Sequence, residues 1–311
     1  MLNKRAKSKK EKNNKVLENS IKQIIYAFTI ILTFIYIAYR ICFTLPLHLG
    51  AIGLICSIIV LLLEIWESVD FFIYYINILN VNKNSPKVPV ITDMSLFPDV
   101  DVLIATINEG ENILRNTIEA CKNMNYPDKS KVHIYVCDDG NRANIKNLAE
   151  NLNVNYITRI TNNDAKAGNY NHALQIIKSP LVATFDADMA PTENFLMKTV
   201  PFFVKEDNIG FIQLPQSFIN PDIFQFRFGL SKKIPFEQDY FYHSIQIAKN
   251  ATNSAIYCGT NTVFSRKALD DVKGFAKNTI SEDIATGMQV ESKGYKCLAL
   301  DDVEAYGIAV D

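Results

Sequence analysis

Cysteine is scarce in this sequence, and its spacing excludes two kinds of site. The six cysteines lie far apart, without the paired spacing of zinc ligands or of a redox motif: Cys42, Cys56, Cys121, Cys137, Cys258 and Cys297. In a cytosolic domain they are expected to be reduced, so we interpret them as packing residues. Internal repeats are also missing, and 32 basic against 33 acidic residues leave almost no net charge.

Charge is absent from two long stretches near the N-terminus. No charged residue occurs from Gln23 to Tyr39, and after Arg40 a second uncharged run extends from Ile41 to Leu63. Each run is near the ~20 residues that a helix needs to cross the hydrocarbon layer. We therefore predict two transmembrane helices within residues 21–63, joined by a turn at Pro46, His48 and Gly50.

A basic tail, residues 1–20, precedes these helices. Residues 1–22 contain eight lysines and arginines against Glu11 and Glu18. A nucleic-acid-binding arm is one interpretation. The apolar runs that follow favour another, in which basic residues keep the tail and everything after Leu63 in the cytoplasm. A cleaved signal peptide is disfavoured because no small-residue cleavage site is evident and a second apolar run follows. The sequence predicts a multi-pass protein of the cytoplasmic membrane, with a lipid bilayer and no nucleic acid as partner.

Residues 64–99 are predicted to connect the membrane to a soluble domain. Aromatic and acidic residues mix from Glu64 to Asn80, which suits an interfacial helix at the headgroup layer. An ordinary amphipathic helix packed on the soluble domain fits equally well. Val81 to Pro98 contains three prolines and is expected to be a linker.

Residues 100–311 alternate between strand-like and helix-like segments, which predicts an α/β domain with a mostly parallel sheet. The expected strands are Val102–Thr106, Val132–Cys137, Asn155–Thr158, Leu181–Phe185 and Ile209–Gln213. The expected helices are Glu109–Met124, Asn144–Asn151, Gly168–Ile177, Glu193–Lys205, interrupted by Pro201, and Ile284–Ser292.

Two carboxylates, Asp186 and Asp188, directly follow the fourth of these strands. Residues two apart on an extended chain point to the same side. At a separation of ~6 Å and an effective dielectric of ~20, two ionised carboxylates repel by roughly 3 kcal/mol. A site that keeps both charged is expected to hold a hard cation, Mg2+ or Mn2+, with a nucleotide diphosphate completing its shell. A solvated acidic turn is the alternative for such a short motif.

Three more polar stretches end or follow expected strands. They are Thr106–Glu109, Cys137–Gly140, and Asp164–Asn169, whose lysine and free backbone amides suit a phosphate. Each alone is common turn or cap chemistry. Ligands bind beyond the carboxyl ends of strands in such sheets, so four polar stretches at corresponding positions indicate one site.

Six motifs, in order, carry a resemblance to a known family. They are DDG at 138–140, KAGN at 166–169, DAD at 186–188, IQLPQSFINPD at 212–222, CGTNTVFSRKAL at 258–269 and TISED at 279–283. Residues 100–311 resemble the catalytic domain of family 2 glycosyltransferases, specifically the cellulose synthase group. The resemblance implies a GT-A type nucleotide-binding α/β sandwich that is preceded in the sequence by a two-helix transmembrane hairpin.

The resemblance also implies roles for individual residues. Thr106, Glu109, Asp138 and Asp139 resemble the uridine-binding elements, Lys166 resembles the diphosphate contact, and Asp188 with Asp186 would hold the metal. Asp283, with Glu282 beside it, resembles the catalytic base. Gln213, Phe218, Cys258, Gly259 and Thr260 would line the acceptor side. The implied reaction is an inverting transfer, most simply of glucose from UDP-glucose, to a growing β-linked polysaccharide.

Two departures from the family pattern bear on this prediction. Ile107 stands where the family has a tyrosine near the uracil, and no Q-x-x-R-W motif occurs in these residues. We expect that the chain is a fragment of a longer synthase, incomplete at its C-terminus and feeble alone, rather than a natural short product. The alternatives are a non-processive or N-acetylhexosamine-type transferase, and a truncated, non-catalytic UDP-sugar binder. Nothing in the sequence identifies partner subunits.

Overall fold

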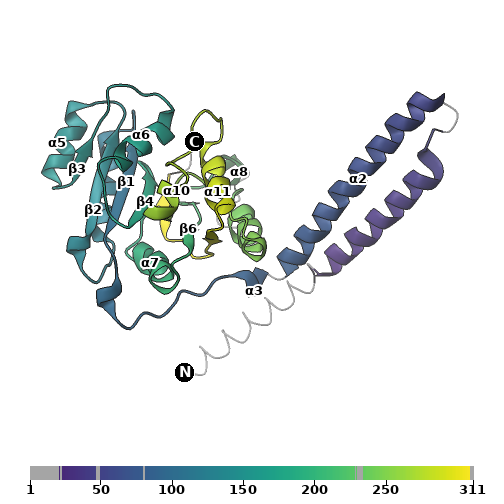
Figure 1. Ribbon diagram of the computed structural model, residues 1–311, viewed down its shortest axis with the longest axis horizontal. Coiled ribbons are helices and arrows are strands. Elements are labelled where there is room, and N and C mark those ends of the chain that lie inside the picture. Colours follow the sequence, from purple (N-terminus) through teal and green to yellow (C-terminus); the bar gives the residue numbers. More distant parts are fainter. Residues whose placement is uncertain are drawn as a thin grey trace. The chain divides into compact units, whose positions relative to one another are not determined.

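The computed structural model describes residues 21, 23–46, 50–79, 81–227, 229 and 234–308 (Figure 1). The chain divides into two compact units, Met1–Asn82 and Lys83–Asp311. The predicted basic tail, residues 1–20, lies outside the described residues.

The first unit contains two long apolar helices. Gln23–Thr44 is helical, with a π-helical end, η1 (Arg40–Thr44), and α2 covers Gly50–Leu79. Both are long and apolar enough to cross a membrane. Arg40 lies within the first helix rather than between the two, and its Nε lies 2.9 Å from Oε2 of Glu64 on α2. Pairing lowers the cost of placing these charges among apolar residues.

Residues 64–79 do not form the separate interfacial helix that the sequence suggests. They continue α2 without a break, since no glycine or proline occurs after Gly53 in this helix. Thirty residues of α-helix extend about 45 Å. This exceeds the ~30 Å hydrocarbon layer, so a third of such a helix would project beyond it. A short helix, α3 (Val81–Asn84), follows, and then an extended stretch that contains η2 (Met94–Leu96).

The second unit is built on a seven-stranded sheet with the order β3-β2-β1-β4-β8-β6-β9. Its strands are β1 (Val100–Thr106), β2 (Val132–Asp138), β3 (Asn155–Ile157), β4 (Leu181–Asp186), β6 (Ile209–Gln213), β8 (Thr262–Ser265) and β9 (Lys296–Ala299). All pairings are parallel except those of β8 with β4 and β6. The predicted mostly parallel sheet is therefore confirmed, and β8 and β9 were not predicted.

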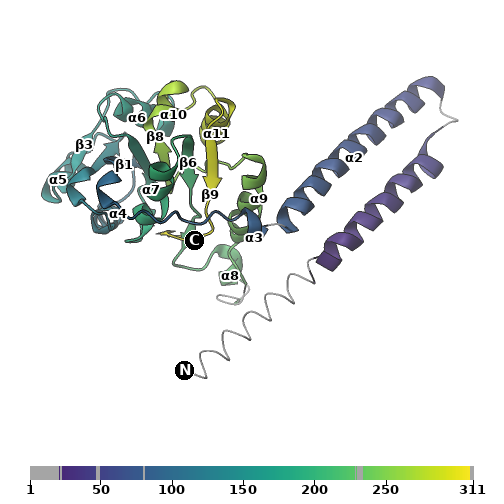
Figure 2. The same cartoon turned by 60° about the horizontal axis from the view of Figure 1, so that its bottom comes forward.

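Helices cover both faces of the sheet, and in Figure 2 the strands lie between α6 and α10 on one side and α4 and α7 on the other. The helices are α4 (Glu111–Asn123), α5 (Ala143–Asn151), α6 (Ala165–Leu174), α7 (Phe195–Lys205), α10 (Arg266–Asp271) and α11 (Glu282–Ser292). Pro201 does not interrupt α7 as expected: the helix continues through it. Proline removes one hydrogen-bond donor, and the buried residues Phe195, Leu196, Val200 and Phe202 hold the helix against the sheet.

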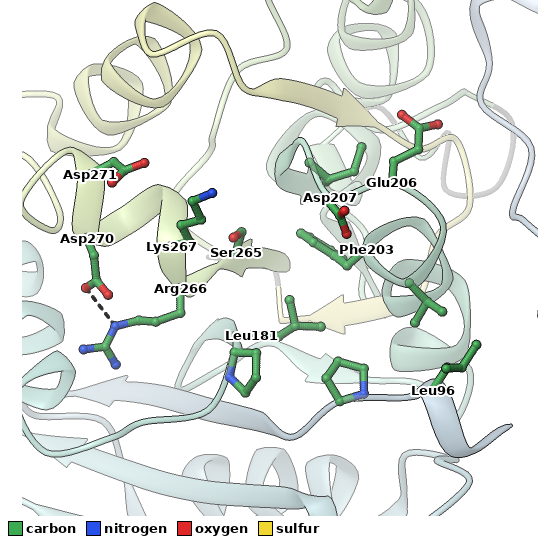
Figure 3. Close-up of a pocket in the computed structure, with 14 residues that line it drawn as sticks. Leu96, Leu181, Phe203, Glu206, Asp207, Ser265, Arg266, Lys267, Asp270 and Asp271 are labelled. Carbon is green, nitrogen blue, oxygen red and sulfur yellow. Dashed lines mark hydrogen bonds and ion pairs between the residues drawn. The ribbon is translucent and has the colours of Figure 1, made fainter.

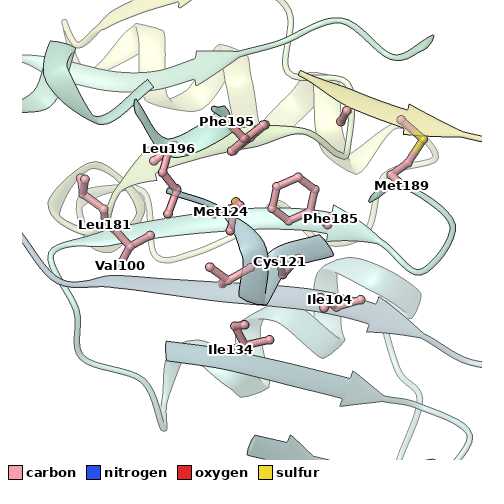
Figure 4. Packing of buried hydrophobic residues seen from close by; sticks show 14 of the residues in the cluster. Val100, Ile104, Cys121, Met124, Ile134, Leu181, Phe185, Met189, Phe195 and Leu196 are labelled. Atoms are coloured by element: carbon pink, nitrogen blue, oxygen red, sulfur yellow. The ribbon is translucent and has the colours of Figure 1, made fainter. Parts of the chain in front are cut away.

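Buried apolar residues explain why these elements pack as they do. Alternate β1 residues Val100, Val102 and Ile104 belong to one core cluster with side chains from α4, α5 and α7 (Figure 4). The opposite face is packed by aromatic rings, among them Phe211, Tyr257 and Phe264, whose centroids lie 4.8 to 6.3 Å apart. Strands covered on both faces need near-continuous apolar sequence, which β1 and β4 have.

Smaller elements complete the unit. A three-stranded sheet joins β5 (Ala190–Pro191), β10 (Ala305–Gly307) and β7 (Ser217–Phe218). Short helical pieces occupy Lys129–Lys131 (η3), Ile223–Arg227 (α8), Phe241–Gln246 (η4), Ile247–Lys249 (α9) and Asn250–Thr252 (η5).

Candidate active site

The strand ends bring the predicted site residues to one edge of the sheet. Thr106 at the end of β1 is in register with Asp138 at the end of β2, and Ala105 is in register with Asp186 at the end of β4. Three of the four polar stretches thus lie side by side. The fourth opens α6, whose Lys166 forms an ion pair with Asp186.

The turn after β4 presents the two carboxylates of the DAD motif. The backbone N–H of Asp186 donates to Thr260 Oγ1 at 2.9 Å, and Thr117 Oγ1 on α4 donates to the carbonyl of Ala187 at 2.7 Å. Asp188 is exposed, while Ala187 between the two is buried. The motif is therefore held by Thr260 on one side and by Thr117 of α4 on the other. Its acidic side chains lie at the surface.

The pKa of the Asp188 carboxyl is raised from its ordinary value. Desolvation of the carboxyl by its neighbours is the largest cause, the negative charge of Asp186 comes next, and Glu109 adds to the effect. Lys166 acts in the opposite direction. A cation bound to both carboxylates would relieve the repulsion between their negative charges.

The donor set fits a metal that completes its shell from the substrate. Within the described residues no group of three or more His, Cys, Asp or Glu side chains converges on one point. Asp186 and Asp188 supply hard oxygen donors from one turn. Mg2+ commonly uses one or two carboxylates together with phosphate oxygens and water, so this pair suits a metal-bound diphosphate better than a structural metal.

A hydrogen-bonded network joins the ends of β1 and β2. Thr106 Oγ1 donates to Glu109 Oε2 at 2.6 Å, and Arg142 donates to Thr106 Oγ1 at 2.8 Å, to the carbonyl of Glu109 at 2.7 Å and to Asp138 Oδ1 at 2.9 Å. Burial would raise the pKa of Glu109, but hydrogen bonds from Thr106 and the amide of Ile107 outweigh it, so the pKa is lowered. Glu109 is thus held as an anion.

Asp138 and Asp139 both face inward. Asp138 is fully buried, and its carboxylate accepts from the Gly140 and Arg142 amides, from the Arg142 guanidinium and from Tyr156 Oη. Asp139 accepts a two-point hydrogen bond from Arg159. In this structure both acids organise the loops beside the predicted uridine site, and their predicted contact with the nucleotide stays a prediction.

Gly259 brings Lys166 and Asp283 together. A Cβ atom placed on Gly259 would lie 3.5 Å from Lys166 Nζ and 3.5 Å from Asp283 Oδ2. Asp283 lies in the first turn of α11, and its Oδ1 accepts from the Ile284 amide at 2.8 Å, so Oδ2 faces the glycine. The predicted diphosphate contact and the predicted base thus converge, although 117 positions separate them in the sequence.

Gln213 holds the turn that carries Gly259. It is 1% exposed. Its Oε1 accepts from the Cys258 amide at 2.9 Å and from Thr262 Oγ1 at 2.7 Å, and its Nε2 donates to the carbonyls of Leu214 and Thr260. Every polar atom of this side chain is engaged inside the protein, so its contribution is to shape the Cys258–Thr262 turn.

Two hollows adjoin at this edge. One, of about 420 Å³, has Asp186, Asp188 and Phe218 in its wall. The other, of about 330 Å³, has Cys258, Asp283 and Tyr242 in its wall. Both include Gln216 and Gln238, which therefore separate the metal carboxylates from the predicted base. Burial raises the pKa of the Cys258 thiol to about 12, so this cysteine is a neutral wall residue rather than a nucleophile.

A larger hollow, of about 630 Å³, lies at the opposite edge of the sheet (Figure 3). Its wall includes Leu181 and Ile209, the first residues of β4 and β6, and none of the predicted site residues. Size alone would favour this cavity over the two hollows just described. The chemistry of the other edge, at the carboxyl ends of the parallel strands, selects the site described above.

Sequence reasoning missed several side chains that shape the site. Arg142 and Arg159 bind the paired aspartates, and Gln216, Phe236 and Gln238 line the hollows. Phe236 packs edge-on against Phe218, with ring centroids 5.9 Å apart. Arg159 follows the third predicted strand, and this position at a strand end was the available signal.

Comparison with known proteins gives matches over the same region. The sequence pattern of glycosyl transferase family 2 matches residues 101–273. The cellulose synthase catalytic subunit (UDP-forming) of Xanthomonas axonopodis pv. citri is 32% identical over 262 residues, covering 84% of this chain and 36% of that protein. The corresponding subunit of Pseudomonas fluorescens is 34% identical over 220 residues, covering 71% of this chain and 30% of that protein. The chain thus spans about a third of these relatives' length.

Among solved structures, a mannosyltransferase from Pyrobaculum calidifontis in complex with GDP-Man and Mn2+ superposes with a TM-score of 0.58. It is 18% identical, and the match covers 77% of this chain and 66% of that one. At this identity the likeness concerns the fold alone. The predicted GT-A type fold is confirmed.

Proposed function

The chain belongs to glycosyltransferase family 2, and on that premise we propose that it transfers a sugar from a UDP-sugar to a growing β-linked polysaccharide. Glucose is the proposed sugar, because the relatives at 32% and 34% identity are UDP-forming cellulose synthase catalytic subunits. The proposed partners are the nucleotide sugar, the polysaccharide acceptor and the lipid bilayer.

The observation that carries this proposal is the meeting of Lys166 and Asp283 at Gly259. Transfer from a sugar diphosphate needs a cation at the leaving group and a base at the attacking hydroxyl, on opposite sides of the reacting carbon. Lys166 supplies the cation, paired with Asp186, and Asp283 supplies the carboxylate. A structural role for either residue would not require both to lie beside the same glycine.

In the proposed reaction the acceptor hydroxyl oxygen forms a bond to the anomeric carbon of the donor sugar. Asp283 takes the hydroxyl proton as the bond forms. The bond between the anomeric carbon and the UDP oxygen breaks, and its electron pair leaves with UDP beside Lys166. A single displacement inverts the anomeric centre, so an α-linked donor gives a β-linked product.

A divalent metal at Asp188 and Asp186 would neutralise charge on the departing diphosphate. The raised pKa of Asp188 and the lack of a third protein ligand within the described residues support a metal that arrives with the nucleotide. The Pyrobaculum structure contains Mn2+ with GDP-Man. We propose Mg2+ or Mn2+ for this chain.

The remaining predicted roles are proposed for residues that surround the site. Thr106 and Glu109 are proposed to bind the uridine, with Asp138 and Asp139 fixing the loops around it. Phe218 supplies a flat apolar surface for an acceptor sugar ring, while Gln216 and Gln238 offer hydrogen bonds to hydroxyls. Cys258, Gly259 and Thr260 form the turn between acceptor and donor, and Glu282 flanks the base.

The apolar helices support a place at the membrane. Gln23–Thr44 and α2 have almost no side-chain burial within the protein, although they are strongly apolar. Lipid is the environment that such surfaces prefer. We propose that both helices span the cytoplasmic membrane and that residues 100–311 act at its cytoplasmic face.

The test is UDP release by the purified, detergent-held protein, with UDP-glucose and a β-glucan oligosaccharide, with and without Mn2+ or Mg2+. We expect metal-dependent release that Asp283→Asn abolishes without loss of UDP binding. Asp207→Asn at the far cavity is the control, and it should leave release unchanged.

The alternatives give different outcomes in the same assay. Faster turnover of UDP-N-acetylglucosamine would identify an N-acetylhexosamine transferase. Tight UDP binding without release from any donor would identify a non-catalytic binder. Absence of UDP binding would refute the proposal as a whole.

A further inference from the structure

Arg159 forms a buried ion pair at the edge of the proposed nucleotide site. Its side chain is 9% exposed and that of Asp139 is 5% exposed. Nε lies 2.6 Å from Asp139 Oδ1, and Nη2 lies 2.7 Å from Asp139 Oδ2. This is the planar, two-point geometry that a guanidinium provides and an ammonium does not.

The same guanidinium also binds the backbone where α6 begins. Nη1 donates to the carbonyl of Asn163 at 2.6 Å, and Nη2 donates to the carbonyl of Ala165 at 2.7 Å. Asn162 Nδ2 donates to the carbonyl of Asp139 at 3.0 Å. Residues 162–165 are thus attached to the Asp139–Arg159 pair at three points.

The backbone of this loop is strained. Asp164 and Ala165 have φ values of 59° and 42°, in the left-handed region that non-glycine residues rarely adopt. Such conformations persist when surrounding contacts determine them. The hydrogen bonds from Arg159 to the carbonyls on either side of Asp164 supply those contacts.

The loop is also pressed against the first turn of α6. A Cβ atom on Gly168 would lie 2.0 Å from the carbonyl oxygen of Asn163 and 2.4 Å from Arg159 Nη1, so a larger residue would displace the loop. Lys166 directly follows Ala165, and its ammonium pairs with Asp186. The direction of Lys166 therefore depends on the loop that Arg159 holds.

We propose that Arg159, anchored by Asp139, is a positioning residue that fixes residues 162–166 so that Lys166 faces the diphosphate of the donor. The inference rests on the proposed function, because it assigns Lys166 to a diphosphate. It gives Asp139 a defined part: the carboxylate orients the guanidinium, and the guanidinium shapes the phosphate-binding loop.

The opposite end of α6 provides a matched control. Arg266 donates to the carbonyls of Leu174 at 2.7 Å and Ile177 at 2.8 Å, and its Nε lies 2.9 Å from Asp270 Oδ1 (Figure 3). Arg266, the first residue of α10, thus has the same chemistry, one acid and two carbonyls, but beside the C-terminal end of α6 at the far edge of the sheet. Arg159→Lys and Arg266→Lys keep the charge and remove the guanidinium that binds one acid and two carbonyls at once.

Three measurements on the full chain in detergent test the proposal. Calorimetry gives the affinities for UDP and for uridine, each with Mn2+ present. Hydrogen exchange gives the opening of amides 163–168 without nucleotide. Thermal unfolding measures how much each substitution destabilises the protein as a whole.

Arg159→Lys should weaken UDP binding roughly tenfold or more and leave uridine binding unchanged, since the loss concerns the diphosphate. Amides 163–168 should exchange faster in this variant. Arg266→Lys should change neither affinity more than about twofold. Equal UDP affinities in the two variants, or parallel losses of UDP and uridine binding in Arg159→Lys, would overturn the proposal.

Failure of the proposed function is distinguishable from failure of this inference. If the unaltered protein binds no UDP, the proposed function fails, and hydrogen exchange alone decides the role of Arg159. Unchanged exchange at residues 163–168 in Arg159→Lys would then refute the positioning role. Faster exchange confined to that loop would support it.

Discussion

Lys166 and Asp283 face the same point of the backbone: a Cβ atom on Gly259 would lie 3.5 Å from the ammonium nitrogen of one and 3.5 Å from a carboxylate oxygen of the other. Gly259 has a φ of +82° and no side chain, so it leaves the space between the two groups open. In the proposed reaction that space admits the reacting carbon, with the leaving group on the lysine side and the acceptor on the aspartate side.

Gly259→Ala should therefore reduce sugar transfer by more than its effect on stability explains. The methyl group would contact both charged groups, and the left-handed backbone adds about 1–2 kcal/mol of strain. Gly294→Ala is the control, because Gly294 has a φ of +86° but no heavy atom within 4 Å of its Cβ position. We expect similar losses in melting temperature for both variants and a loss of UDP release for Gly259→Ala. Equal activities would show that the space at Gly259 is not used.

Asp188→Ala should abolish metal-dependent binding of UDP. The substitution removes one of the two hard oxygen donors at the DAD turn. Calorimetric titration of UDP in the presence of Mn2+, and again with a chelator, measures the effect. Asp207→Ala, an exposed acid at the far cavity, should behave like the unaltered protein. UDP binding of undiminished strength in Asp188→Ala would contradict the metal assignment.

Thr286→Val should slow transfer without weakening UDP binding. Thr286 Oγ1 accepts from the Ala276 amide at 2.9 Å and donates to the carbonyl of Glu282 at 2.5 Å, which fixes the first turn of α11 and with it Asp283. Loss of two buried hydrogen bonds costs about 1–3 kcal/mol and releases this turn. We expect UDP release to fall severalfold while the dissociation constant of UDP stays constant.

A threonine on α7 is the matched control for this variant. Thr199 is equally buried, and its Oγ1 donates to the carbonyl of Phe195 at 2.9 Å, away from the site. Thr199→Val should leave both the rate and the affinity unchanged. A comparable fall in rate for Thr199→Val would mean that general destabilisation, rather than the position of Asp283, accounts for the result.

Much of the architecture could be predicted from the sequence, because local patterns determine it. The strands β1, β2, β4 and β6 are predominantly apolar, as doubly covered parallel strands require, and the polar residues that end them mark the ligand edge. The strand ends at Thr106, Asp138 and Asp186 adjoin in the structure as this rule predicts.

Partners far apart in the sequence could not be predicted in this way. Strand β8 follows a stretch of glycine and hydroxyl residues that is typical of a turn, and its antiparallel place between β4 and β6 depends on tertiary pairing. The pairing of Arg159 with Asp139 spans 20 residues, and the hydrogen bond between Gln213 and the Cys258 amide spans 45. Composition carries no signal for such contacts.

The pH dependence of stability should reveal a carboxyl on α11 that destabilises the native state when it is ionised. Glu291 Oε1 is buried without a hydrogen-bond partner among the described residues, and burial raises the pKa of Glu291 from 4.5 to about 7. Between these two pH values the native state binds a proton that the unfolded state has lost, so the free energy of unfolding decreases as pH rises. Above pH 7 the carboxyl is ionised in both states, and the cost of burying its charge lowers the free energy of unfolding by a constant amount.

Glu291→Gln removes this ionisation and should flatten the profile. The variant should match the unaltered protein near pH 5 and exceed it at pH 8 by about 1 kcal/mol, after allowance for the partial exposure of the carboxyl. Melting temperatures at pH 5, 6, 7 and 8 measure the difference. Glu119→Gln, on the exposed face of α4, should run parallel to the unaltered protein. If Glu291→Gln instead lowers stability equally at every pH, the carboxylate has a stabilising partner, and its ionised form is not the source of strain.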